Sequence, residues 1–207
     1  DFDMRITGGK YCGRKVIVPN GEMEIRPAMD RMRESLFAIL GPLDGVSFCD
    51  LFSGSGCVGL EAASRGASLV HLVEMDRAKR PIMEKNISWA LDECDIKIFN
   101  SNVLKFIPTS RIEYDIVYAD PPFPMPNKVQ LAQLVERRGM VKPDGLFIIH
   151  FPTAEQNQWC ESFGNLKLVD TRRYGRNMLK FYKYSQEETQ VEDVVGAADK
   201  EGFNAVD

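Results

Sequence analysis

A four-residue segment, Asp120-Pro121-Pro122-Phe123, follows an apolar stretch that ends at Ala119. The carboxylate and the main-chain carbonyl of Pro121 can accept the two hydrogens of a planar exocyclic amine, and this orients the nitrogen lone pair. Two consecutive prolines fix φ and remove competing N–H donors. The ring of Phe123 offers a base a stacking surface worth roughly 1–3 kcal/mol. These four residues are therefore predicted to be the catalytic loop of an enzyme that modifies an amino group on a base.

A glycine-rich turn follows an earlier apolar stretch, residues 46–51. Its G-x-G-x-x-G spacing is provided by Gly54, Gly56 and Gly59. Such glycines let the backbone turn sharply, approach a ligand closely and pack the next helix tightly. The motif alone is weak because NAD-binding and FAD-binding folds share it. Asp50, before the glycines, can order the turn or meet a cationic amino-acid group, and Glu74 can take both hydroxyls of a ribose.

The two motifs are expected to face one another across one cleft, since the strands that carry them are neighbours where the winding of the sheet reverses. A cleft that holds both motifs could bring the amine next to S-adenosylmethionine. The sulfonium of this cofactor is an activated methyl donor, so alignment of the amine with the methyl group supplies most of the catalysis. NAD-dependent oxidation is disfavoured because Asp-Pro-Pro-Phe has no role in hydride transfer. C5-cytosine methylation needs a cysteine nucleophile in the cleft, and none of the five cysteines follows a proline.

Strands and helices alternate from Val46 onward, which predicts a doubly wound α/β fold. The expected strands are 46–51, 69–74, 96–99, 114–119, 145–151, 166–173 and 178–184. The expected helices are 58–65, 77–93, 102–107, 127–138 and 154–163. Only four residues separate the last two strands, so these form an antiparallel hairpin. The prediction is a Rossmann-like class I methyltransferase fold: a mostly parallel seven-stranded sheet with a C-terminal antiparallel hairpin, preceded by an N-terminal β-hairpin and helix.

The N-terminal hairpin is expected from strands at 4–7 and 15–18, and the helix from about 27 to 40. Charge is distributed unevenly along the chain. Residues 186–207 contain seven acidic side chains and one lysine, so the rest of the chain carries a net charge of +2 although the whole chain carries −4. Seven basic side chains fall within residues 4–33, which suggests a polyanionic partner. The predicted units are 1–42, basic hairpin and helix; 43–185, methyltransferase domain; and 186–207, acidic tail.

Metal and membrane sites are not expected. The cysteines lack metal-ligand spacing, and no apolar run approaches the roughly 20 residues needed to span a bilayer. The only two histidines, His71 and His150, fall in expected strands. A buried, hydrogen-bonded side chain is favoured over a catalytic one for both.

Several motifs together resemble the bacterial 16S ribosomal RNA (guanine-N2)-methyltransferase family over residues 4–184. The motifs are Arg5-Ile6-Thr7-Gly8-Gly9, Gly13-Arg14-Lys15, Arg26-Pro27, Asp30 to Phe37, the glycine turn at 50–61, Glu74 to Arg77, Asn102, and Asp120 to Phe123. The N-terminal motifs are the specific ones, since many amino-group methyltransferases share the last. Ala28 departs from the threonine that is frequent in the family, so a hydroxyl contact is absent there.

The resemblance implies which residues bind S-adenosylmethionine. They are Asp50, Phe52, Ser53, Gly54, Gly56, Gly59, Glu74, Met75, Asn102 and Val103. It also implies basic substrate-binding residues near the cleft entrance, which would hold the cofactor loop or RNA. These are Arg5, Arg14, Lys15, Arg26, Arg31 and Arg33.

The function that the resemblance implies is methylation of the exocyclic N2 of a guanine in 16S ribosomal RNA, within a small-subunit particle in the cytoplasm, by a monomeric enzyme. Methylation of adenine N6 in DNA or RNA stays open as an alternative because it uses the same loop chemistry. A non-catalytic RNA-binding module is the alternative from a different class. It would keep the basic face but would have no need of Glu74 and Asp120 together.

Overall fold

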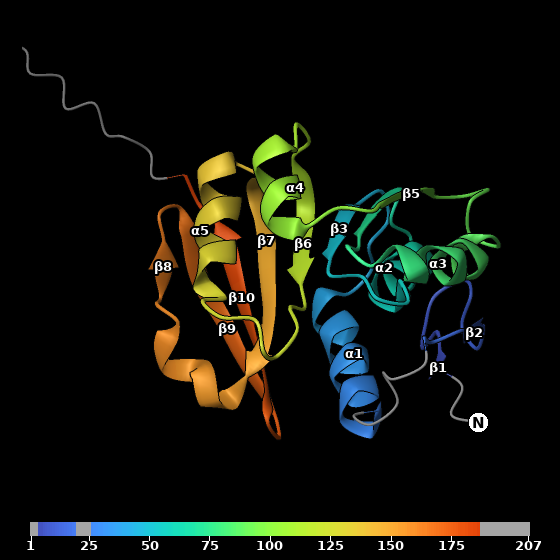
Figure 1. Cartoon of the computed structure of the whole chain (residues 1–207), viewed down its shortest axis with the longest axis horizontal. Coiled ribbons are helices and arrows are strands. Elements are labelled where there is room, and N and C mark those ends of the chain that lie inside the picture. Colours follow the sequence, from blue (N-terminus) through green and yellow to red (C-terminus); the bar gives the residue numbers. More distant parts are fainter. Residues whose placement is uncertain (1–3, 20–25, 187–207) are drawn as a thin grey trace, which may run out of the picture.

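The computed structural model describes residues 4–19 and 26–186, apart from the side chains of residues 26–28. Eight strands form one sheet in the order β5-β4-β3-β6-β7-β10-β9-β8 (Figure 1). The bounds are β3 Ser47–Leu51, β4 Leu69–Val73, β5 Asp95–Phe99, β6 Tyr114–Ala119, β7 Val141–Pro152, β8 Ser162–Phe163, β9 Leu166–Tyr174 and β10 Asn177–Tyr184. Strands β3 to β7 are parallel, and β10 runs antiparallel to both β7 and β9. The winding reverses between β3 and β6, so a crevice is expected at their carboxyl ends.

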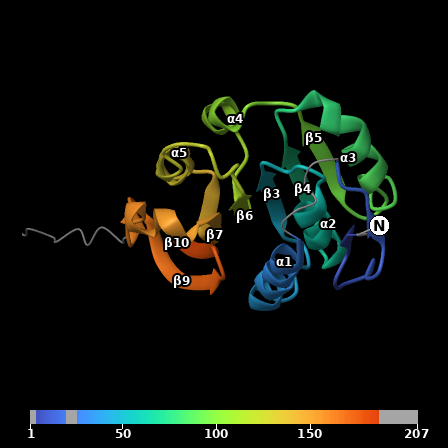
Figure 2. The same ribbon diagram turned by 60° about the horizontal axis from the view of Figure 1, so that its bottom comes forward.

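Helices cover both faces of the sheet (Figure 2). Their bounds are α1 Arg26–Leu40, α2 Cys57–Ser64, α3 Arg80–Ile87, α4 Val103–Thr109 and α5 Val129–Arg138, with short 3-10 helices η2 Arg77–Lys79 and η3 Thr153–Gln158. The apolar sides of α1, α2 and α3 pack into one core cluster with the sheet, and those of α4 and α5 pack into a second cluster on the other face. The sheet is therefore buried from both sides, which explains why all five residues of β3 are buried, without alternation.

The predicted fold class is confirmed, and all seven expected strands are present. The helix expected at 154–163 is wrong, because the chain forms η3 and then the two-residue strand β8. This path lets the Trp159 ring stack on Phe151, with 4.9 Å between the ring centroids, and lets the Phe163 ring contact Tyr182, with 5.5 Å between the centroids. Aromatic packing against the sheet thus replaces the helix and adds an eighth strand.

The helix expected at 77–93 is also wrong in extent. Asp76 caps η2 by accepting a hydrogen bond from the Ala78 amide, and α3 then begins at Arg80. Pro81 lies in the first turn of α3, where its missing N–H costs nothing. The helix ends at Ile87 and turns follow. Proline therefore divides the predicted helix into two shorter ones.

The N-terminal hairpin consists of β1 Met4–Arg5 and β2 Lys15–Val16, both shorter than expected. Ile6, Val16 and Phe37 are buried in the same cluster as the first strands of the main sheet. The Phe37 ring packs on Phe48 with 6.3 Å between the ring centroids. Residues on both sides of position 42 thus share one core, and the division into units remains a prediction. The acidic tail, beyond Gln186, lies outside the described residues.

Among the described residues, no helix combines the length and the apolar character that crossing a membrane requires.

Candidate active site

A cavity of about 540 Å³ lies at the carboxyl ends of the parallel strands. Its wall is made by the turn after β3, the end of β4, the segment after β6, one side of α1, and two side chains from β7 and β10. The residues of the first three are Asp50, Phe52 to Ser55, Cys57, Val58, Glu74 and Asp120 to Pro124. The glycine turn and the Asp-Pro-Pro-Phe loop therefore line a single cavity, as the sequence predicts.

The glycine turn is shaped by its backbone. Gly56 has φ 82° and precedes the first residue of α2, a left-handed conformation that glycine adopts without strain. A Cβ on Gly59 would lie 2.4 Å from Leu72 Cδ2, so glycine is required for α2 to pack on β4. The Gly59 amide donates to Asp50 Oδ2 at 3.1 Å. Asp50 therefore orders the start of α2, one of the two roles expected for it.

Three carboxyl groups, those of Asp50, Glu74 and Asp120, line the cavity together with the cationic side chains of Arg33 and Lys79. Burial raises the pKa of Asp50 well above its usual value; the Gly59 hydrogen bond opposes this shift, and the charges of Asp120 and Glu74 reinforce it. Glu74 is 8% exposed, and its Oε1 lies 3.2 Å from Lys79 Nζ. A cationic ligand in this cavity would relieve the repulsion among the carboxylates. A sulfonium with an α-ammonium group has the required charge.

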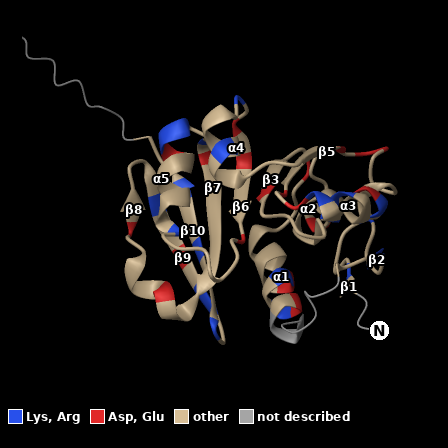
Figure 3. Cartoon of the chain, in the orientation of Figure 1, with Lys and Arg blue, Asp and Glu red and all other residues tan. Residues whose placement is uncertain are grey.

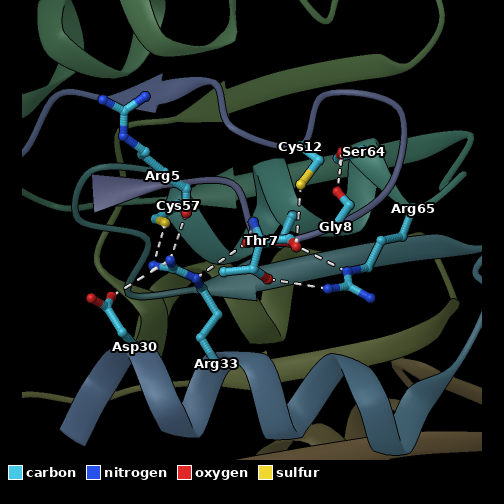
Figure 4. Close-up of polar contacts among 10 residues, drawn as sticks. Arg5, Thr7, Gly8, Cys12, Asp30, Arg33, Cys57, Ser64 and Arg65 are labelled. Atoms are coloured by element: carbon cyan, nitrogen blue, oxygen red, sulfur yellow. Dashed lines mark hydrogen bonds and ion pairs between the residues drawn. The ribbon is translucent and has the colours of Figure 1, made fainter. Parts of the chain in front are cut away.

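A buried ion network fastens the N-terminal hairpin and α1 to α2 (Figure 4). Glu61 is completely buried, and its carboxylate lies 3.3 Å from both Arg33 Nε and Arg65 Nε. It also accepts a hydrogen bond from the Thr7 amide. The Arg33 guanidinium donates to Cys57 Sγ at 2.9 Å and to the carbonyl of Arg5 at 2.7 Å. The network therefore joins the hairpin and α1 to the first residue of the helix that follows the glycine turn.

The Asp-Pro-Pro-Phe loop is held by side chains that lie far away in the sequence. Lys128 is completely buried, and its Nζ donates to the carbonyl of Phe123 at 2.8 Å and to that of Met125 at 2.9 Å. Glu155 neutralises this ammonium at 2.8 Å. Every N–H of the Lys128 ammonium thus has an acceptor within reach, so the loop has a defined path. Phe123 remains 40% exposed and can offer its ring to a base.

Not every expected cofactor residue lines the cavity. Met75 is 66% exposed and is absent from the cavity wall. Asn102 caps α4 by accepting from the Leu104 amide at 2.9 Å, and Val103 is buried beneath it. Asn102 and Val103 are likewise absent from the cavity wall, and the contacts of all three residues with a cofactor stay predictions.

The structure places Arg33 away from the exposed basic residues. Its side chain is only 6% exposed, lies in the ion network and lines the cavity. It fits one half of the expectation, which was to hold the cofactor loop. Arg5, Arg14, Lys15 and Arg31 are exposed. Arg5 donates to the Gly13 carbonyl and Arg14 lies over the Trp89 ring at 5.3 Å, whereas the side chain of Arg26 lies outside the described residues.

Three residues of the site were missed by sequence reasoning: His150, Asn177 and Lys128. His150 Nδ1 lies 2.7 Å from Asp120 Oδ1, and its Nε2 lies 2.8 Å from Asn177 Oδ1. The histidine is buried and hydrogen-bonded as predicted, but its partner is the aspartate of the catalytic loop. The available signal was its position near the end of a parallel strand beside the one that carries Asp120, because carboxyl ends of strands meet at one edge.

Comparison with known proteins agrees with this arrangement. A family model described as Conserved hypothetical protein 95 matches residues 4–183. Ribosomal RNA small subunit methyltransferase D of Escherichia coli K12 is 37% identical over 70% of this chain and 73% of its own length. The protein of the same name from Haemophilus influenzae is 34% identical over 71% and 78%. The solved structure of Escherichia coli yhhF has a TM-score of 0.79 at 32% identity, covering 89% of this chain and 99% of that one. The chain therefore belongs to the Conserved hypothetical protein 95 family, that of the small-subunit ribosomal RNA methyltransferases D.

Proposed function

We propose that this protein transfers a methyl group from S-adenosylmethionine to the exocyclic N2 of a guanine in 16S ribosomal RNA. One observation carries the proposal: Asp120 to Phe123 and the glycine turn line the same cavity, whose other carboxylates, Asp50 and Glu74, suit a cationic donor. The relatives named ribosomal RNA small subunit methyltransferase D support the RNA substrate. A ribosomal substrate also favours the cytoplasm as the place of reaction. The assembled particle as substrate and the monomeric state stay predictions.

One set of cavity residues would bind the methyl donor, and another set would bind the amine that accepts the methyl group. S-adenosylmethionine supplies an electrophilic methyl group when it is bound. The turn from Phe52 to Gly54 brings main-chain groups to the donor, and Glu74 accepts hydrogen bonds from its ribose. On the other side, Asp120 and the Pro121 carbonyl accept the two amine hydrogens. Together these contacts align the amine with the methyl group, and alignment can supply most of the catalysis.

The cofactor assignment has a direct test in binding. Glu74→Ala should weaken S-adenosylmethionine binding roughly 10–100-fold, because a charged hydrogen-bond acceptor contributes about 1.5–3 kcal/mol. Isothermal titration measures the change. Glu113→Ala is the matched control, since that exposed side chain lies just before the amino-terminal end of β6, away from the cavity. Equal affinity in the Glu74→Ala and Glu113→Ala proteins, or binding of NAD in place of S-adenosylmethionine, contradicts the assignment.

An arginine-rich turn supports a polyanionic substrate. Because β10 runs antiparallel to β7, the turn between β9 and β10 lies beside the carboxyl ends of the parallel strands, where the cavity opens. Arg172, Arg173 and Arg176 are exposed there, and only Arg172 pairs with a carboxylate in the described structure, Asp170 at 3.1 Å. Figure 3 shows this basic tip below β9 and β10. Phosphates of an RNA whose guanine enters the cavity would lie within its reach.

Replacing Arg172, Arg173 and Arg176 together with alanine should raise the KM for RNA and leave the affinity for S-adenosylmethionine unchanged. Each phosphate contact that is lost lowers the salt dependence of RNA binding by about 0.7–0.9 logarithmic units per decade of salt. The control replaces Arg111, Arg137 and Lys142 with alanine. These residues lie near the amino-terminal ends of the parallel strands, away from the cavity, and the control removes the same charge. If both triple variants change the KM equally, net charge and not this turn determines RNA binding.

Product analysis distinguishes guanine N2 from adenine N6. Undermethylated ribosomal RNA, free and in small-subunit particles, is incubated with tritiated S-adenosylmethionine and digested to nucleosides. Label in N2-methylguanosine supports the proposal. Label in N6-methyladenosine favours the alternative, which uses the same loop.

A further inference from the structure

His150 makes two hydrogen bonds whose donors can be assigned from its neighbours. The Asn177 Nδ2 group donates to the Tyr174 carbonyl at 3.3 Å, so the amide oxygen of Asn177 faces His150. That oxygen lies 2.8 Å from His150 Nε2. A carbonyl-type oxygen can only accept, so Nε2 must carry a proton and donate.

The contact on the other side of the ring needs a second proton. His150 Nδ1 lies 2.7 Å from Asp120 Oδ1. A carboxylate has only acceptor sites, and an unprotonated ring nitrogen is an acceptor too. The short distance therefore requires a hydrogen between Nδ1 and the carboxylate. With Asp120 ionised, both ring nitrogens are protonated.

We infer that His150 is an imidazolium cation that positions the ionised carboxylate of Asp120 for the amine. The inference rests on the proposed function for the role of Asp120, whereas the protonation state rests on the two contacts together with an ionised Asp120. His150 is then a positioning residue. It is not the base, because neither nitrogen has a free lone pair.

The groups around the ring are consistent with a charged form. His150 is 1% exposed. It faces Asp120 beyond β6 and Asn177 on β10, while Phe123 approaches with 5.7 Å between the ring centroids. The nearby ammonium of Lys128 is paired with Glu155. Burial and Lys128 disfavour the cation, but the charge of Asp120 and the two hydrogen bonds outweigh them, so the pKa of His150 rises above 6.5.

The imidazolium determines which carboxylate oxygen is available. Oδ1 of Asp120 is committed to His150, so Oδ2 is left to accept a hydrogen of the amine. When the nitrogen gains its methyl group and loses a proton, that proton passes to Oδ2 and then to solvent. His150 keeps both of its protons throughout. The carboxylate is therefore fixed in rotation and cannot turn its second oxygen away from the substrate.

The two histidines of the chain make a spectroscopic test possible. In a protein labelled with ¹⁵N-histidine only His71 and His150 give signals, and His150→Gln assigns them. His71 is an internal reference, because burial, followed by the charge of Lys97, lowers its pKa below 6.5. Long-range ¹H–¹⁵N spectra from pH 5 to 9 should show His150 doubly protonated at pH values where His71 is neutral.

Substitution of either partner should lower the pKa of His150. The decrease should be larger in Asp120→Asn, which removes a charge, than in Asn177→Ala, which removes one hydrogen bond. An unchanged titration in both variants, or a neutral His150 ring at pH 6 in the unsubstituted protein, overturns the inference. These spectra need no methyl transfer, so they can fail or succeed independently of the proposed function.

The pH dependence of catalysis gives a second readout. The charged form of His150 is lost as the pH rises through its raised pKa, so kcat should fall across the same pH range in which its NMR signals titrate. His150→Gln should lower kcat at least 10-fold, remove this decline with pH and leave S-adenosylmethionine binding unchanged. A purely structural histidine would leave the shape of the pH profile unaltered, and that result would falsify the positioning role.

Discussion

Asp120→Asn should lower the rate of methyl transfer by about 10²–10⁴-fold, the usual effect of losing a positioned proton acceptor. The carboxamide has one acceptor oxygen where the carboxylate has two. It therefore cannot offer one oxygen to His150 and a second oxygen to the substrate amine, and it carries no charge to stabilise the imidazolium. Single-turnover rates with saturating RNA and S-adenosylmethionine measure the effect. The dissociation constant for S-adenosylmethionine should remain close to that of the unsubstituted protein.

Asp144→Asn is the matched control for this substitution. Its side chain is 85% exposed within β7, and its φ of 64° is a conformation that asparagine adopts readily. The control should retain full activity. Activity of the Asp120→Asn protein close to that of the control would show that the loop does not act on the amine.

Glu61→Ala should lower the free energy of unfolding by about 3–5 kcal/mol, the usual cost of removing one partner of a buried ion pair. The Arg33 guanidinium, 6% exposed, would lose its carboxylate, and the Thr7 amide would lose its acceptor. For a protein of this size each kcal/mol corresponds to about 2–4 °C in Tm. Calorimetry should therefore record a decrease of roughly 6–20 °C.

Glu84→Ala provides the comparison on the surface. Glu84 pairs with Arg80 at 2.8 Å, one helical turn away, and both side chains are about half exposed. Such pairs contribute about 0.3–0.5 kcal/mol. Similar decreases in Tm for the two variants would mean that the network around Glu61 contributes little, and that α1 and the hairpin are held by apolar contacts alone.

The strands were predictable because the apolar stretches are short, contiguous and separated by turn residues. The catalytic loop and the glycine turn were predictable for a related reason. Each is a local motif at the end of a strand, and the topology of parallel sheets brings such ends together. The observed path of residues 154–163 was not predictable from local preference, because aromatic contacts of Trp159 and Phe163 with the sheet determine it.

The side chains that support the loop could not be found from the sequence for a physical reason. A lysine such as Lys128 is ordinarily expected at the surface. Only the fold brings Glu155 and two loop carbonyls around its ammonium. Arg33 is a second case of the same kind. It lies in a basic segment that suggests an RNA-binding surface. In the structure its guanidinium is buried and forms an ion pair with Glu61. Whether a charge lies inside or outside depended in both cases on a partner more than 25 residues away.

The two outer strands of the sheet bear on how the protein behaves at high concentration. An unpaired strand edge can recruit another chain and begin aggregation. At one border β8 has only two residues, which is too short a template for such pairing. At the other border β5 presents exposed Asp95 and Lys97, and their charges oppose the docking of a second sheet. Both borders are thus protected, and this protection opposes edge-to-edge pairing between copies of the protein at high concentration.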